Sequence, residues 1–130
     1  MNFPTDLKFS QEHEWVRLGE DNTAYVGITD FAQSELGELV YVEVDTIGDE
    51  LDMGEVFGTV EAVKTTSDLY MPLSGKILEF NPNLDENEGD DPTQINSAPY
   101  GEGWIIKMEI RDPEELATLM DATAYKNLVS

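Results

Sequence analysis

The sequence contains no cysteine and a single histidine, His13. Without thiols, disulfide bonds, thiolate metal sites and a cysteine nucleophile are all excluded. Neither a glycine-rich phosphate loop nor a His/Asp metal-ligand spacing is present. An enzyme of this size needs convergent polar groups, and a lone histidine is more typical of a partly exposed strand residue than of a general base. We therefore expect neither a catalyst nor a metal site.

Basic residues are also scarce: 7 Lys and Arg side chains stand against 28 Asp and Glu side chains, which gives a net charge of −21. Such a field repels nucleic-acid phosphates and anionic lipid head groups, so neither is an expected partner. No apolar run approaches the roughly 20 residues of a membrane span. The amino terminus lacks the basic and apolar regions of a secretory signal. These absences predict a cytoplasmic protein.

The chain does contain enough apolar residues for one core, because 40% of its residues are hydrophobic, among them 2 Trp, 5 Tyr and 5 Phe. We expect a single domain over residues 1–130. Alternating and β-branched residues predict six strands, over residues 14–18, 23–28, 39–44, 56–63, 69–73 and 104–110. In the fourth strand, Val56, Gly58, Val60 and Ala62 are expected on one face and Phe57 on the other. The middle of the chain is therefore predicted to be sheet.

Helix signals are confined to short segments. Asp30 with Gln33 resembles a capping box, which predicts a helix over about 30–36 that ends before Gly37. Asp112-Pro113 is a strong helix start, and Asp121 is a candidate cap for a further short helix. After Pro113, three residues are expected to face the sheet: Leu116, Leu119 and Met120. The short helix after Asp121 is expected to carry Tyr125 and Leu128.

The polar segment 81–92 is expected to be a solvated loop. The predicted strands, the short helices and this loop together indicate a mainly β fold, a small β-sandwich with short peripheral helices.

Lys64 is one of only five lysines, and it lies in a polar segment between two predicted strands, near the tip of a hairpin. From its position alone, the simpler interpretation is an ordinary solubilising residue. The surrounding sequence favours a different one. Gly58 to Gly75, with Glu61-Ala62-Val63-Lys64 and Pro72-Leu73-Ser74-Gly75, resembles the lipoyl-attachment hairpin of glycine cleavage H proteins.

The resemblance covers nearly the whole chain. It includes His13-Glu14-Trp15-Val16, Val26-Gly27-Ile28-Thr29, Ala32-Gln33, Leu36-Gly37 and Tyr41-Val42 in the first half, and Ile95-Asn96-Ser97, Pro99-Tyr100-Gly101, Gly103-Trp104 and Asp121-Ala122-Thr123-Ala124-Tyr125 in the second. Three features depart from the family pattern: Ala62 replaces the usual serine, Val44-Asp45 stands where leucine-proline is usual, and the loop through Glu88 is slightly long. The first of these bears on recognition by a lipoylating enzyme.

The resemblance implies a lipoyl-domain-like β-sandwich, a barrel-sandwich hybrid, with its hairpin sheet at about 23–110 and a helical segment at about 113–129. It implies lipoic acid in amide linkage to Lys64. A glycine decarboxylase would load the arm with an aminomethyl group, an aminomethyltransferase would unload it, and a dihydrolipoamide dehydrogenase would reoxidise it. Lipoylating enzymes would modify the chain. The expected molecule is a non-catalytic, monomeric carrier of glycine catabolism.

A loaded arm ends in an amine exposed to attack by water, so the carrier benefits from a cleft that shelters it. Glu14 is a candidate carboxylate for that amine, Ile28 and Leu36 are candidates for apolar contact, and Asp68 is a weaker acidic candidate. The alternative is that all four are ordinary strand, core or loop residues. Two other functions stay open: a lipoyl or biotinyl domain of another multienzyme complex, and an unmodified acidic interaction protein.

Overall fold

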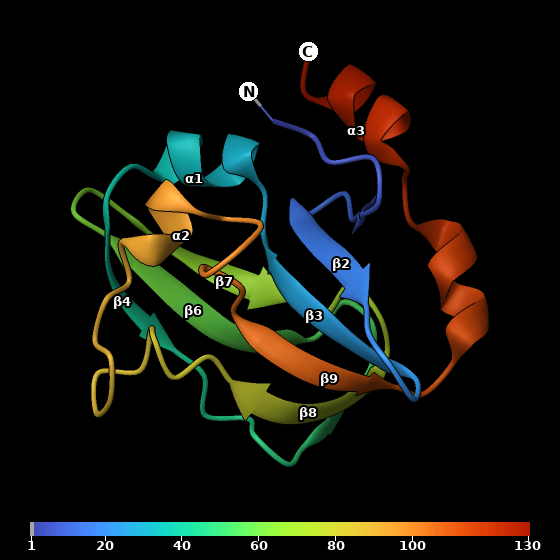
Figure 1. Cartoon of the computed structure of the whole chain (residues 1–130), viewed down its shortest axis with the longest axis horizontal. Helices are drawn as coiled ribbons and strands as arrows, with labels where there is room; N and C mark the ends of the chain where they lie inside the picture. Colours follow the sequence, from blue (N-terminus) through green and yellow to red (C-terminus); the bar gives the residue numbers. More distant parts are fainter. Residues whose placement is uncertain (1) are drawn as a thin grey trace.

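A computed structural model describes residues 2–130, and two β-sheets surrounded by short helices make up the fold (Figure 1). The larger sheet has six strands in the order β1 (Lys8–Phe9), β2 (Glu14–Leu18), β3 (Thr23–Ile28), β9 (Ile106–Ile110), β8 (Gly75–Phe80) and β5 (Glu50–Leu51). The smaller sheet has the order β4 (Leu39–Glu43), β6 (Val56–Ala62) and β7 (Thr66–Tyr70). Every pairing is antiparallel. The expected mainly β architecture is confirmed.

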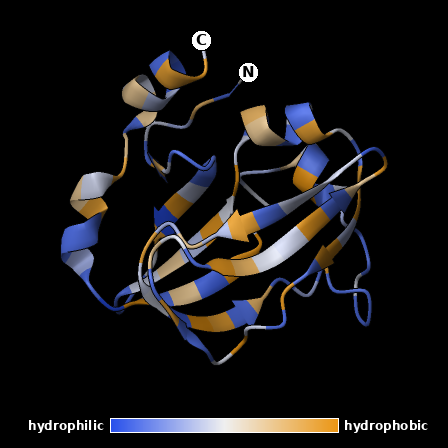
Figure 2. Cartoon of the chain, turned by 180° about the vertical axis from the view of Figure 1, so that it is seen from behind, coloured by the Kyte–Doolittle hydropathy of each residue, from blue (hydrophilic) through white to orange (hydrophobic). Residues whose placement is uncertain are grey.

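The main core joins the inner faces of both sheets. Val26 and Met108 contribute from the large sheet, and Val42, Val60 and Leu69 contribute from the small one. Alternation of apolar and polar residues along the strands is visible as orange and paler or blue bands in Figure 2. Because successive strand residues point to opposite faces, this pattern buries one face of each sheet, and the other face of the larger sheet is covered at β1 and β2 by a second core.

Strand β6 departs from the predicted alternation. The β6–β7 register shifts between Val56 and Gly58, which marks a bulge. A bulge adds one residue to one strand and reverses the facing of the residues before it. Phe57 is consequently buried in the core with Val60 and Ala62, whereas Val56 is 43% exposed. Val56 and Phe57 do face opposite sides as predicted, but the prediction that Val56 shares a face with Val60 and Ala62, and Phe57 does not, was wrong.

Four short helices lie at the margins of the sheets: α1 (Asp30–Leu36), α2 (Gln94–Ser97), the 3₁₀ helix η1 (Pro113–Thr118) and α3 (Ala122–Leu128). The first is capped one residue earlier than predicted, because Thr29 and not Asp30 accepts the hydrogen bond from the Ala32 amide. Asp112 and Asp121 cap the two later helices as predicted. Across residues 2–130, the helices are all too short or too polar to cross a membrane.

A second, smaller core lies where α3 meets β1 and β2. Phe9, Trp15 and Tyr125 are fully buried there, and the rings of Phe9 and Tyr125 stack with their centroids 4.7 Å apart. Leu116 and Leu119 pack against the main core as expected. Met120 packs in this second core and not in the main one. Tyr125 and Leu128 both lie on α3 as predicted, Tyr125 buried and Leu128 50% exposed.

Further expectations need correction. The strand predicted over 69–73 begins at Thr66 and ends at Tyr70, and a separate strand, β8, follows at Gly75. The 81–92 loop is not wholly solvated, because Asn81 and Leu84 are buried and the Asn81 side-chain amide donates to the carbonyls of Glu102 and Trp104.

His13 also differs from expectation, because it is not a strand residue. It precedes β2 with a φ of 70°. Its Nδ1 lies 2.8 Å from the Tyr125 hydroxyl, which ties the start of β2 to helix α3.

Candidate functional site

Lys64 lies on the turn that joins β6 to β7, as the sequence predicts. The amide of Ala62 donates to the carbonyl of Thr65 at 2.7 Å, which closes the turn, and Lys64 is exposed. The amide of the preceding residue, Val63, donates to the carbonyl of Glu38 at 3.1 Å. This bond attaches the hairpin tip to the segment that follows α1. The amine therefore projects from a turn whose backbone is held in place.

The side chain of Lys64 lies over the end of α1. Gly37 ends that helix with a φ of 85°, and a Cβ atom placed on Gly37 would lie 3.4 Å from Cε of Lys64 and 3.9 Å from its Nζ. A side chain at position 37 would be strained by the positive φ, and its Cβ would meet the lysine at ordinary van der Waals distance. Glycine thus serves both as the helix terminator and as the open floor beneath Lys64.

Asn96 on α2 holds this floor in place. Its Nδ2 donates to the carbonyl of Gly37 at 2.8 Å and to Oε1 of Gln33 at 3.0 Å, while its Oδ1 accepts from the amide of Leu39 at 2.9 Å. Three hydrogen bonds from one side chain join α2, the end of α1 and the start of β4. In the sequence, Asn96 stands out only as part of the family resemblance, with no predicted role of its own.

A cleft of about 300 Å³, the α1 cleft, opens between α1, the Glu12–Glu14 segment and the β6–β7 hairpin. It brings together all four residues singled out from the sequence. Its lining consists of Glu12, His13, Glu14, Ile28, Phe31, Ala32, Glu35, Leu36, Val60, Ser67, Asp68 and Leu69. Leu36 is the residue before Gly37, so the cleft begins next to the floor over which Lys64 lies.

Glu14 is the buried acid of the α1 cleft, with only 2% of its surface exposed. Its Oε1 accepts from the hydroxyl of Ser10 at 2.7 Å, and its Oε2 accepts from the backbone amide of Tyr70 at 3.2 Å. Within residues 2–130 no ion pair reaches Glu14. Burial raises the pKa of Glu14 to about 8, against the lowering effect of its two hydrogen-bond donors. The carboxyl group is therefore poised to ionise near neutral pH when a cation arrives.

The other acids of the α1 cleft are more open to solvent. Glu12, Glu35 and Asp68 are exposed, whereas Ile28 is buried and Leu36 is half-buried. His13 is the only basic group in the lining, and burial lowers the pKa of its imidazole, which favours the neutral form. The cleft thus combines apolar walls with acidic groups. These features fit a guest that has an apolar body and an amine, such as a loaded lipoyl arm.

Sequence reasoning missed Ser10, Glu12, Glu35 and the backbone amide of Tyr70. Strand parity offers a signal for the burial of Glu14, because Glu14 and Val16 share a face of β2 and Val16 is a core residue. No comparable local signal identifies Tyr70, since its amide reaches Glu14 only after two sheets have packed. A contact across 56 residues is not encoded in a short sequence pattern.

Comparisons with known proteins agree with this geometry. Residues 7–130 match the family model for the glycine cleavage H-protein. The chain is 53% identical over 130 residues to a glycine cleavage system H protein of Bacteroides thetaiotaomicron, covering 100% of this chain and 99% of the relative. It is 54% identical over 124 residues to one of Symbiobacterium thermophilum, covering 95% and 93%. A crystal structure of a Mycobacterium marinum glycine cleavage system H protein superposes with a TM-score of 0.85 at 35% identity, covering 96% and 97%.

Proposed function

Because the chain belongs to the glycine cleavage H-protein family, a family of lipoyl carriers, we propose that Lys64 is its lipoyl-attachment residue and that the α1 cleft shelters the arm. The observation that carries the proposal is the position of Lys64. Its amine lies at an exposed hairpin tip, over Gly37 and beside a cleft with apolar walls and a buried carboxyl group. The likeness to the Mycobacterium marinum structure also supports the lipoyl-domain-like form of the sandwich.

The residues of this chain act by binding and positioning. Lys64 offers a primary amine that an acyl-transferring enzyme can convert to an amide, while the bond from Val63 to Glu38 keeps the tip fixed. Ile28 and Leu36 offer apolar surface to an arm lying in the cleft, and the walls limit access of water. Glu14 accepts hydrogen bonds from an amine, and its carboxyl gives up its proton as the cationic group enters. Asp68 adds negative charge near the opening.

When bound, a lipoyl group supplies two sulfurs that undergo thiol–disulfide exchange and carry an aminomethyl group. The proposed partners are a glycine decarboxylase that loads the carrier, an aminomethyltransferase that unloads it, a dihydrolipoamide dehydrogenase that reoxidises it, and the lipoylating enzymes. Family membership supports a place in the glycine cleavage multienzyme system. In this proposal the chain is a non-catalytic carrier. The monomeric state, the cytoplasmic location and the single-domain organisation remain predictions.

Mass spectrometry of the protein purified from its native host tests the assignment of Lys64. We expect one lipoyl group per chain, located by peptide mapping on the peptide that contains Lys64. Lipoylation removes one positive charge, so the net charge moves from −21 to −22 and the isoelectric point falls. A lipoyl group on any other lysine, with Lys64 free, would exclude the proposed attachment site.

The two alternatives left open by the sequence give different masses. A biotinyl group on Lys64 would indicate a carrier for carboxyl-transfer chemistry. An unmodified chain from a host with active glycine cleavage would support an acidic interaction protein. The family match already argues against both alternatives.

A further inference from the structure

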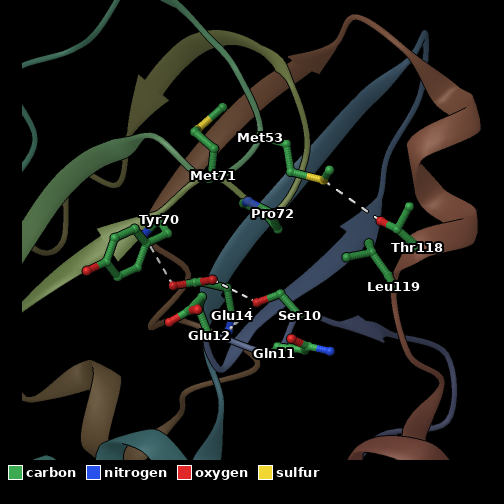
Figure 3. A pocket seen from close by; sticks show the side chains of 11 residues that line it. Ser10, Gln11, Glu12, Glu14, Met53, Tyr70, Met71, Pro72, Thr118 and Leu119 are labelled. Atoms are coloured by element: carbon green, nitrogen blue, oxygen red, sulfur yellow. Dashed lines mark hydrogen bonds between the residues drawn. The ribbon is translucent and has the colours of Figure 1, made fainter.

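A second cleft, the Met53 cleft, opens on the other side of Glu14 (Figure 3). It has a volume of about 440 Å³ and lies between the Ser10–Glu12 segment, the turn at Met53–Gly54 and the Thr118–Leu119 end of η1. Glu12 and Glu14 line both this cleft and the α1 cleft, and no other residue does. One buried carboxyl group is thus a shared wall of two separate cavities.

The walls of the Met53 cleft suit a flexible aliphatic chain. Met53, Met71 and Leu119 provide apolar surface, and unbranched methionines adapt their shape to a guest. Met53 is 44% exposed, and its sulfur accepts a long hydrogen bond of 3.8 Å from the hydroxyl of Thr118. Figure 3 shows Glu12 and Glu14 gathered on one side of the cleft and Met53 and Thr118 on another. Apolar surface and acidic groups therefore line the same cavity.

The charge of the Met53 cleft has one sign. Its lining contains the carboxyl groups of Glu12 and Glu14 and no lysine, arginine or histidine. Glu14 is buried beside the hydrogen-bond donors Ser10 and Tyr70, and no ion pair within residues 2–130 compensates its negative form. A buried carboxylate gains stability from a cationic partner with good hydrogen-bond geometry. The lining of this cleft therefore suits a positive charge on an apolar stem.

We propose that the Met53 cleft receives a lysine side chain from an enzyme partner, with the stem packed on Met53 and Leu119 and the ammonium group held by Glu12 and Glu14. Each oxygen of Glu14 already accepts one hydrogen bond, so a compact ammonium fits better than the planar fork of an arginine. The net charge of −21 favours a partner with a basic surface. The identity of that partner class rests on the proposed function.

This assignment links docking to the α1 cleft. Glu14 is the carboxylate that the proposed function offers to an arm in the α1 cleft, and the same group would meet the lysine in the Met53 cleft. Two cations approaching one carboxylate from opposite sides repel each other and share its hydrogen-bonding capacity. A docked lysine therefore weakens the hold of Glu14 on its guest, which frees the guest when the partner is in place.

The binding test needs no lipoyl group and uses the unlipoylated full chain. Backbone amide NMR is recorded during titration with Nα-acetyl-lysine-N-methylamide, and with the norleucine analogue, which lacks the ammonium group. Of the two clefts, Gly54, Thr118 and Leu119 line the Met53 cleft alone, whereas Ala32 and Leu36 line the α1 cleft alone. We expect saturable shifts at the first set of amides with the lysine probe, and binding of the norleucine probe that is weaker by about tenfold.

Two variants obstruct the cleft in different ways. Thr118→Phe fills its mouth, and Thr123→Phe makes the same change at an exposed site on α3 as the matched control. Met53→Lys places an ammonium group of the chain's own beside the acids. We expect both cleft variants to lose the probe shifts and the Thr123→Phe control to keep them. Both altered residues lie at the surface, so we expect both variants to fold. Collapse of the amide spectrum would reveal an unfolded variant, and the probe titration of the other variant would then test the proposal.

Kinetics with lipoylated carrier complete the test. We expect Thr118→Phe to raise the apparent KM of at least one glycine cleavage enzyme by about fivefold relative to Thr123→Phe, as for loss of an interfacial charge pair. Shifts confined to the α1 cleft, equal binding of the two probes, or unchanged KM with every enzyme would overturn the proposal. None of these outcomes depends on which lysine is lipoylated, so the assignment of Lys64 is judged separately by mass spectrometry.

Discussion

Glu14 combines two features that rarely occur together, near-complete burial and the absence of a charged partner within residues 2–130. Its folded-state pKa of about 8 lies well above the ordinary value of 4.5. The folded chain therefore binds more protons than the unfolded chain between these two pH values. The free energy of unfolding must fall as pH rises through that window, because deprotonation is easier in the unfolded state.

Glu14→Gln removes this ionisation while keeping the shape of the side chain. We expect the variant to gain stability relative to the natural chain by about 1.4 kcal/mol for each pH unit between 4.5 and 8. Urea unfolding at pH 5, 7 and 9 measures the difference. Glu109→Gln, at an exposed position on β9, is the control and should show no such trend. Parallel stability curves for Glu14→Gln and the natural chain would mean that Glu14 ionises normally.

Lys64 contrasts with Glu14 because its importance is chemical and not structural. Lys64→Arg should leave the free energy of unfolding within about 0.5 kcal/mol of the natural value, since the side chain is exposed. A guanidinium cannot take its place in the amide linkage, so lipoylation and glycine cleavage should both be lost. Lys76→Arg, at an exposed position on β8, should retain both. Full activity of Lys64→Arg would remove Lys64 from the mechanism.

The sequence predicted residue positions better than residue environments. Lys64 at a hairpin tip follows from two strand patterns and a polar turn, both of which are local. The burial of Glu14 and its contact with the Tyr70 amide depend on how two sheets pack, and no short pattern contains that information. For the same reason the Met53 cleft, built from four distant segments, was not foreseen.

At the scale of elements, α2 is short but joins α1 to β4 through Asn96. Asn96→Ala should lower the free energy of unfolding by about 2 kcal/mol, because it removes three partly buried hydrogen bonds. It should also shift the amide resonances of Gly37 and Lys64, since the floor beneath the lysine loses its support.

Asn87→Ala is the matched control for Asn96→Ala, because Asn87 is exposed and bonds only to Asp85 within its own loop. Its stability should be close to natural. If the two variants unfolded at the same urea concentration, Asn96 would not be the link between these elements. If Asn96→Ala lost stability but left the Lys64 amide resonance unchanged, Asn96 would stabilise the fold without positioning the attachment site.

Most elements with a clear periodic pattern were predicted, although β8 was missed despite its alternating burial, and elements made by tertiary contact were not. The hairpin of β2 and β3 pairs Val16 with Val26, as the apolar pattern on both sides of the turn implies. In contrast, β1 and β5 have two residues each and exist only through pairing with β2 and β8. Such short segments carry no periodicity of their own, so their assignment requires the assembled sheet.

At the scale of the whole molecule, the charge of −21 should govern encounter with the partner enzymes. Attraction to basic surfaces speeds association, and added salt screens it. We expect the apparent KM for lipoylated carrier to rise with ionic strength for each partner. Free lipoamide, which is neutral, is the control for salt effects on the enzymes themselves. Equal salt responses of carrier and lipoamide would show that charge serves solubility alone.

The bond network around Tyr125 also sets an order in time. Its hydroxyl lies 2.7 Å from Oγ1 of Thr29, the cap of α1, and 2.8 Å from His13, which lines the α1 cleft. A ribosome makes the Lys64 hairpin well before it makes α3, and chains begin to fold as they emerge. The nascent hairpin can form before Tyr125 is made. The wall of the α1 cleft that Tyr125 secures, through His13 and Thr29, cannot. During biosynthesis, the attachment site thus precedes the finished cleft.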